Sequence, residues 1–270
     1  TAAQVTGKTV NGAGDLTITA LAADTVLTNV NPDNGVTANV AADIDVTTNT
    51  ALGNVDTYTI ATGVTLTATA DQVTAKTVNG EGTLTVSGTA AGDTNYANLS
   101  ADVVDITGAN LTGGTVTYMT VAAGDELRLT SVQATGTTIA AATDSTAVIT
   151  VTGLAADANL ANIGNATATV NVTVAADRDV TANGNLGNVD TFAVATGITL
   201  TATAAQVTGD TVNGAGTLVI TALAADSDLT NVNPDGGVTA NVAADIDVTG
   251  NNNLGNVDTF AVATGITLTA

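Results

Sequence analysis

The chain of 270 residues is 44% hydrophobic and strongly acidic, since 25 acidic side chains against four basic ones give a formal net charge of −21. Binding to a nucleic-acid backbone needs clustered Lys and Arg, so this balance excludes nucleic acid as a partner. The chain also has no Cys and no His, which excludes the common nucleophile–base pairs of enzymes.

The remaining composition favours β-structure. The apolar residues are mainly Ala, Val, Leu and Ile, Thr is the commonest polar residue, and Pro occurs twice. β-branched residues favour strands over helices. Apolar and polar residues alternate, which is typical of a folded chain and not of a disordered acidic tail. No run of 18 apolar residues occurs, so we expect no membrane-spanning helix in this segment.

Short alternating runs recur about every ten residues in the first part of the chain. Each predicts a strand of five to seven residues. In chain order the predicted strands are 4–10, 15–20, 25–30, 36–41, 44–49, 55–60 and 64–70. The segments between them contain NGAG, AAD, NPDNG, ALGN and ATG, in which Gly, Asn and Asp supply the turn conformations.

The chain is a tandem array of repeats of about 68 residues. Residues 203–270 match residues 1–68 without a gap, with 55 of the 68 positions identical. Four repeats follow one another, with the second divergent: 1–68, 69–134, 135–202 and 203–270. The last residues run in phase into the first ones, which predicts an excerpt of a longer array. Within the second repeat, residues 92–118 depart most, and we expect a lateral contact, a bulge or a partner site there.

Two all-β architectures fit this pattern. The phrases LAAD, VAAD and IATG begin at Leu21, Val40 and Ile60, which predicts a β-solenoid with coils of 19–20 residues. The alternative is a string of small seven-stranded sandwiches, one per repeat, although such domains usually need about 100 residues. We favour the solenoid.

One aromatic residue occupies the same register in every repeat: Tyr58, Tyr118, Phe192 and Phe260. A single anchor per repeat would suit a separate sandwich core. In a solenoid, these rings would lie about three coils apart and would mark either a wider place in the interior or a contact with another chain.

Recurring aspartates are the candidate metal ligands. The phrase AADIDV and its relatives place two acidic residues two positions apart in three repeats: Asp43, Asp45, Asp177, Asp179, Asp245 and Asp247. Calcium takes six to eight oxygen ligands, which carboxylates and turn carbonyls can supply. The alternative is that each Asp only caps a solvated corner. We expect no cofactor other than calcium.

Repeated T-x-T runs suggest a hydroxyl ladder of the kind seen on some ice-binding solenoids. The runs at 16–19, 64–69 and 198–203 do not recur at one constant coil spacing, so we do not expect a regular ladder. Paired carboxylates recur at turns in several repeats, as expected of residues that close a turn in each repeat and not of one active site. We therefore expect a protein that is not an enzyme.

Phrases such as TAAQVTGKTVNGAG at 1–14 and QVTAKTVNGEGTLTV at 72–86, in an acidic chain without Cys, resemble the repeat regions of very large bacterial surface and secreted proteins. This resemblance implies an exported, extracellular or cell-surface protein. We expect a structural component of a filament, sheath or surface layer that associates with itself, or the rigid stalk of an adhesin. A cell surface or a polysaccharide is the further partner that the resemblance implies.

Overall fold

The chain winds into stacked parallel coils. The structure, a computed structural model, describes residues 1–143 and 146–270. In this part of the chain the named strands pair in parallel, about 6% of the residues are helical, and the coils form a β-solenoid of about 13 turns. The predicted solenoid is therefore confirmed. The sandwich alternative is wrong, because its sheets would be antiparallel.

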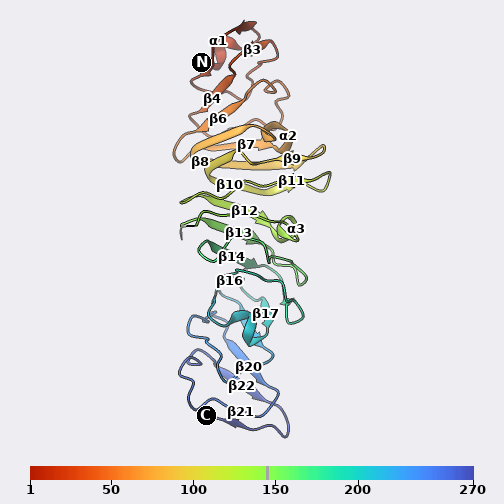
Figure 1. Ribbon diagram of the computed structural model, residues 1–270, viewed down its shortest axis with the longest axis vertical. Helices are drawn as coiled ribbons and strands as arrows, with labels where there is room; N and C mark the ends of the chain where they lie inside the picture. Colours follow the sequence, from red (N-terminus) through yellow and green to blue (C-terminus); the bar gives the residue numbers. More distant parts are fainter. Residues whose placement is uncertain (144–145) are drawn as a thin grey trace. The chain divides into compact units, whose positions relative to one another are not determined.

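The coils divide into two compact units, and their boundaries do not follow those of the predicted repeats. Unit 1 consists of Thr1–Leu129 and Ile139–Val148. Its elements, most of which are labelled in Figure 1, are α1 (Ala2–Val5), β1 (Val10–Gly12), β2 (Leu16–Ile18), β3 (Val30–Pro32), β4 (Val36–Val40), β5 (Ile44–Asp45), β6 (Thr57–Ile60), β7 (Thr65–Thr69), α2 (Ala70–Val73), β8 (Thr77–Thr89), β9 (Thr94–Asn95), β10 (Leu99–Asn110), β11 (Val116–Thr117) and β12 (Glu126–Thr130, whose last residue belongs to unit 2).

Unit 2 consists of Thr130–Thr138 and Ile149–Ala270. Its elements are α3 (Ser131–Ala134), β13 (Val148–Thr152, whose first residue belongs to unit 1), β14 (Thr169–Val174), β15 (Arg178–Asp179), β16 (Thr191–Val194), β17 (Thr199–Ala202), α4 (Ala204–Val207), β18 (Thr211–Asn213), β19 (Thr217–Ile220), β20 (Val238–Val242), β21 (Ile246–Asp247), β22 (Thr259–Val262) and β23 (Leu268–Thr269).

Strands of successive coils in unit 1 stack in three columns. The first column pairs β1 with β3, the second runs through β2, β4, β6 and the start of β8, and the third runs through β5, β7, the middle of β8, β10 and β12. Paired residues of the second column are 20 positions apart, as in Thr37 with Thr57 and Thr57 with Thr77. This spacing confirms the predicted coil length.

Unit 2 has the same construction. One column runs through β14, β16 and β18, a second through β15, β17, β19, β20 and β22, and a third pairs β21 with β23. In each unit, alternate residues point inward and form the dry core. This arrangement explains why small β-branched residues suffice, since each coil packs only on its neighbours.

In two repeats, the aromatic residue at the shared position lies in the core. Tyr58 and Phe192 are almost fully buried. Tyr58 pairs with Ala38 on one side and Val78 on the other, so a large ring is accommodated between smaller neighbours. Phe192 pairs similarly with Val172 and Val212. These two rings therefore fill wider places in the interior, one of the two roles expected for them.

The sequence repeat and the structural coil have different periods. Leu16 lies in the second column of unit 1, paired with Val36. Its counterpart one repeat later, Leu84, lies in the third column, paired with Leu66. A repeat of 68 residues is not a whole number of 20-residue coils, so the same repeat position comes to lie on different columns.

Because the repeat and the coil differ in period, threonines of successive coils form a ladder that the T-x-T runs in the sequence do not show. The outward-facing threonines of the second column in unit 1 follow one another in register: Thr17, Thr37, Thr57 and Thr77. The expectation that no regular ladder exists is therefore wrong for this column. The ladder takes one Thr from each of four coils, whereas the sequence pattern looked for whole runs that recur.

Three predicted strands are wrong in part. The segment 44–49 is a strand only at Ile44–Asp45 and then forms a turn. The segment 4–10 begins within the helical turn α1, and the equivalent part of the second repeat begins within α2. A Thr and a Gln three positions later cap each turn, as Thr69 and Gln72 do. The segment 25–30 forms turns until Val30, because the buried Thr25 hydroxyl hydrogen bonds to the backbone of Ala22.

The divergent residues 92–118 enlarge the coils of unit 1. β8 and β10 are 13 and 12 residues long and pair with register shifts, whereas most other strands have two to six residues. The short strands β9 and β11 pair beside them and form a lateral extension (Figure 1). Tyr96 is buried within it. The strand lengths and register shifts fit a bulge, one of the three possibilities for this segment, while the lateral contact and the partner site stay predictions.

Candidate functional site

The first aspartate of each predicted metal pair accepts a hydrogen bond from the next coil. The Asp43 carboxylate accepts from the backbone N–H of Thr65 at 2.8 Å. Asp177 accepts from Thr199 at 2.8 Å, and Asp245 accepts from Thr267 at 2.7 Å. All three side chains are exposed. Each of these carboxylates therefore ties a corner of its coil to the strand stacked on it.

The second aspartate of each pair closes its own turn. Asp45 accepts from the backbone N–H of Thr47 at 2.9 Å and from the Thr47 hydroxyl at 2.6 Å. Asp179 and Asp247 hold Thr181 and Thr249 in the same way. Donation from the Thr hydroxyl, and then from the backbone N–H, lowers the pKa of all three carboxyls. They are therefore stabilised as anions.

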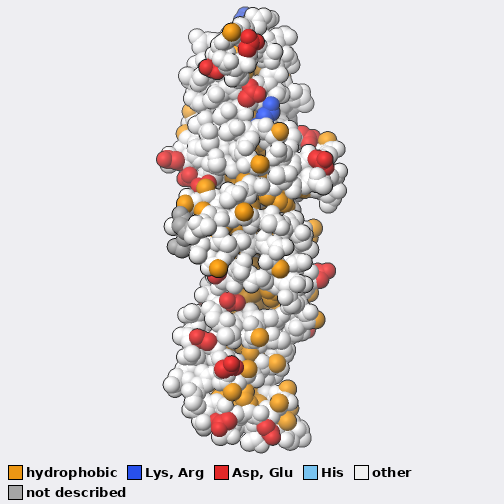
Figure 2. Space-filling model, viewed as in Figure 1, with side chains coloured by type: hydrophobic (Ala, Val, Ile, Leu, Met, Phe, Trp, Pro, Cys, Tyr) orange, Lys and Arg blue, Asp and Glu red, His pale blue; other side chains and the backbone are white. Residues whose placement is uncertain are grey.

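The calcium expectation stays a prediction. The structure places the two carboxylates of a pair at one exposed corner, and in each of them one oxygen accepts the hydrogen bonds just described. Within residues 1–143 and 146–270, no three Asp or Glu side chains come together as a metal-binding group. Figure 2 shows acidic side chains scattered in small groups over the visible surface.

The sequence reasoning missed a set of Gln side chains that connect coils. Gln72 donates through Nε2 to the carbonyl oxygens of Val46 and Asn49, at 2.6 and 2.7 Å. Gln206 makes the same two bonds to Val180 and Asn183. The signal was present as T-x-x-Q at 69–72 and 203–206, a capping-box pattern. The pattern predicts the turn, but the two carbonyl acceptors belong to another coil.

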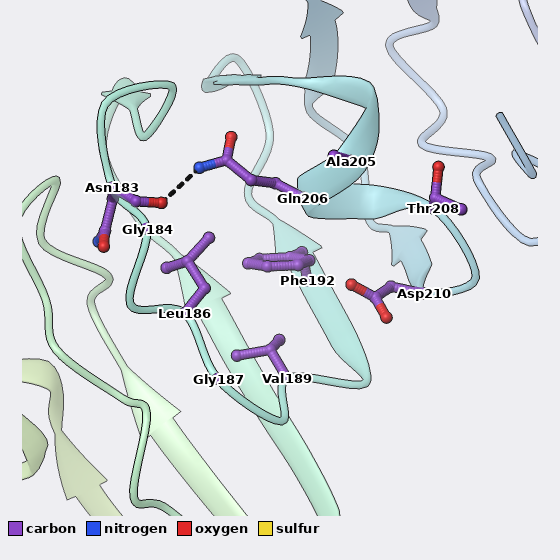
Figure 3. A pocket seen from close by; sticks show the side chains of 10 residues that line it. All are labelled: Asn183, Gly184, Leu186, Gly187, Val189, Phe192, Ala205, Gln206, Thr208 and Asp210. Carbon is purple, nitrogen blue, oxygen red and sulfur yellow. Dashed lines mark hydrogen bonds between the residues drawn. The ribbon is translucent and has the colours of Figure 1, made fainter. Parts of the chain in front are cut away.

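A cavity lies beside the Gln206 turn in unit 2. It has a volume of about 330 Å³ and is lined by the loop after Asn183 and by residues of α4 and its C-terminal side. Figure 3 shows Leu186, Val189, Phe192 and Asp210 around it, with Gln206 bonded to the Asn183 carbonyl. Burial, and then the nearby negative charge of Asp190, raises the pKa of Asp210 to about 6.

Unit 1 contains the corresponding cavity, with different charged groups. Its volume is about 430 Å³, and Leu52, Gly53, Gln72, Asp71 and Lys76 are among its lining residues. Lys76 stands where unit 2 has Asp210, and its Nζ donates to the Gly53 carbonyl at 3.0 Å. Because one cavity is lined by an acid and a base and the other by a single acid, one ligand common to both is not supported. They are better described as gaps between a loop and the helical turn stacked on it.

Comparisons of the chain with models of protein families, with characterised proteins and with solved structures found no match. In the described part of the chain, no helix has the length and apolar character needed to cross a membrane.

Proposed function

We propose that this chain is a structural element of an extracellular filament, sheath or surface layer, and that its work is mechanical. The observation that carries the proposal is the unbroken parallel stacking in each unit, for example from β2 through β4 and β6 to β8. A force along the axis of such a stack acts on the backbone hydrogen bonds between successive coils. The continuous apolar core resists the same force.

Side chains reinforce the contacts between coils. Gln72, Asn49 and Asn54 each donate to two carbonyls of another coil. Asp56 accepts from the backbone N–H of Val36 on the preceding coil at 2.8 Å. Such bonds satisfy backbone groups at the corners, where the strand ladder is interrupted. A chain built in this way needs no ligand to hold its coils together.

The charge distribution suits an exposed, β-rich surface. An unpaired strand at the edge of a sheet could template pairing with another chain, and dispersed negative charge opposes such aggregation. A net charge of −21 also keeps separate copies apart at low salt. Self-association into ordered material should therefore depend on salt or on divalent cations.

The test is electron microscopy of the purified chain at low salt, at high salt and with calcium followed by a chelator. Ordered fibres or sheets with an axial repeat support the proposal. Isolated rods under every condition would instead support the alternative, the stalk of an adhesin. Degradation of a polysaccharide by the purified chain would contradict both, since neither role includes catalysis.

A further inference from the structure

The second column of unit 1 carries two parallel rows of outward-facing polar side chains, here called the hydroxyl ladder. Its first row is Thr17, Thr37, Thr57 and Thr77, and its second row is Asn39, Thr59 and Asn79. Stacked strands lie about 4.8 Å apart, and alternate residues of one strand lie about 6.6–6.8 Å apart. The ladder is therefore a two-dimensional grid with constant spacing in both directions.

The grid is rigid. The residues between its rows point inward and are buried: Ile18, Ala38, Tyr58 and Val78. They hold the strands in place from below. Thr itself is stiff because its branched Cβ restricts χ1. The hydroxyl and methyl groups of the first row are thus presented in a fixed arrangement.

The hydroxyls of the first row make no side-chain hydrogen bond to a protein group among residues 1–143 and 146–270. Two charged residues that neighbour the ladder in sequence direct their groups elsewhere. The Asp56 carboxylate accepts from the Val36 N–H, and the Lys76 ammonium donates to the Gly53 carbonyl. The seven ladder positions carry no charge, in a chain with 25 acidic residues.

These properties restrict the ligand. A polyanion would be repelled by the net charge of −21. A ligand that engages the whole grid must therefore not be a polyanion, must accept and donate hydrogen bonds, and must itself repeat in two directions. Crystalline water meets all three conditions. We propose that the hydroxyl ladder binds ice, by ordering a layer of water that joins the ice surface.

The chain contains its own control for this proposal. Residues 36–46 and 238–248 are identical in sequence, so Thr37 and Thr239 are equivalent residues on β4 and β20, with the same alternation of burial. Thr37 lies between Thr17 and Thr57. Thr239 lies between Val219 and Thr259, and the second row beside it contains Ala261. Only Thr37 belongs to an uninterrupted ladder.

The experiment measures partition of the full chain into slowly growing ice, together with inhibition of ice recrystallisation. We expect the wild type to be enriched in ice, Thr37→Lys to lower that enrichment by about tenfold, which corresponds to about 1.4 kcal/mol of binding free energy, and Thr239→Lys to leave it unchanged. Thr57→Lys is a second ladder variant. Circular dichroism and thermal unfolding identify which of the two ladder variants keeps the native fold and can be compared.

Three results would overturn the proposal. The first is exclusion of the wild type from ice. The second is an equal loss from Thr37→Lys and Thr239→Lys, which would assign the effect to added charge and not to the ladder. The third is retention of full ice binding by a folded ladder variant. Binding to crystalline cellulose or chitin without binding to ice would equally assign the grid to another neutral solid.

Discussion

Asp210 occupies the position in unit 2 that Lys76 occupies in unit 1. Lys76 donates to the carbonyl of Gly53. Asp210 cannot donate in its ionised form, and it lies near the negative charge of Asp190 in a half-buried site. The two positions have similar surrounding sequences. Asp in place of Lys therefore replaces a stabilising contact between coils with repulsion from Asp190.

This exchange predicts a stability change with pH. The folded-state pKa of Asp210, about 6, lies above its ordinary value, so its ionisation opposes folding. Its contribution to stability is complete below the ordinary pKa and is lost as the pH rises through about 6. We therefore expect the urea midpoint of unit 2 to rise as the pH falls from 7 to 5.

Two substitutions check this assignment. Asp210→Asn should flatten the pH dependence and stabilise the protein at pH 7 by at most about 2 kcal/mol, because the half-exposed carboxyl is partly screened by solvent. Lys76→Asp is the reciprocal variant and should introduce the same dependence into unit 1. An Asp210→Asn variant that keeps the wild-type pH profile would show that another group is responsible.

Tyr58→Phe should stabilise the protein. The Tyr58 hydroxyl is buried and has no hydrogen-bond partner in the part of the chain that the structure describes, and burial raises its pKa far above the ordinary value. Its counterpart in unit 2 is Phe192, so the site accepts the ring without the hydroxyl. Removal of an unsatisfied buried hydroxyl should raise the free energy of unfolding by about 1 kcal/mol, measured in urea.

The reverse change, Phe192→Tyr, is the matched control and should destabilise unit 2 by about 1–3 kcal/mol. If Tyr58→Phe lowered the stability instead, the hydroxyl would have a partner in solution, such as an internal water molecule.

Gly80→Ala should be strongly destabilising. Gly80 has a φ of +107°, and a Cβ atom there would lie 2.1 Å from the backbone oxygen of Ile60 on the preceding coil. The unfavourable φ and the clash with backbone together should cost at least about 2 kcal/mol. Gly92→Ala is the control, because its Cβ would meet nothing within 4 Å. Equal thermal unfolding midpoints for the two variants would contradict this close stacking.

Much of the fold could be predicted because successive coils of a solenoid follow the same local sequence pattern. The intervals of 19 and 20 residues from LAAD at Leu21 to VAAD at Val40 and on to IATG at Ile60 reflect the coil itself, and they match the pairing of Thr37 with Thr57. Alternation of apolar and polar residues marks the inward positions of β4 and β7. Both signals depend on neighbours in the sequence and need no knowledge of which coil packs on which.

The candidate sites were harder to predict because they depend on register between coils. The hydroxyl ladder takes residues from four coils, and Thr85, the repeat counterpart of Thr17, lies in another column beside Thr67. The bonds of Gln72 end on backbone carbonyls, which every residue possesses, so no residue type marks the acceptors. The exchange of Lys76 for Asp210 was visible, but the cavity around each was not.

The calcium prediction for the aspartate corners leads to a weak site. At one corner the Asp43 and Asp45 carboxylates each accept hydrogen bonds through one oxygen, which leaves two carboxylate oxygens for an ion that takes six to eight ligands. We expect calcium to raise the thermal midpoint only at concentrations near the millimolar range of extracellular modules. The variant Asp43→Asn with Asp45→Asn should lose part of that increase, while the same substitutions in the other two pairs, at Asp177, Asp179, Asp245 and Asp247, should remove the rest. Magnesium at the same concentration is the control, because it demands a stricter octahedral geometry. If both ions raised the thermal midpoint equally, the cause would be screening of the negative charge. The aspartates would then act only as caps of their turns.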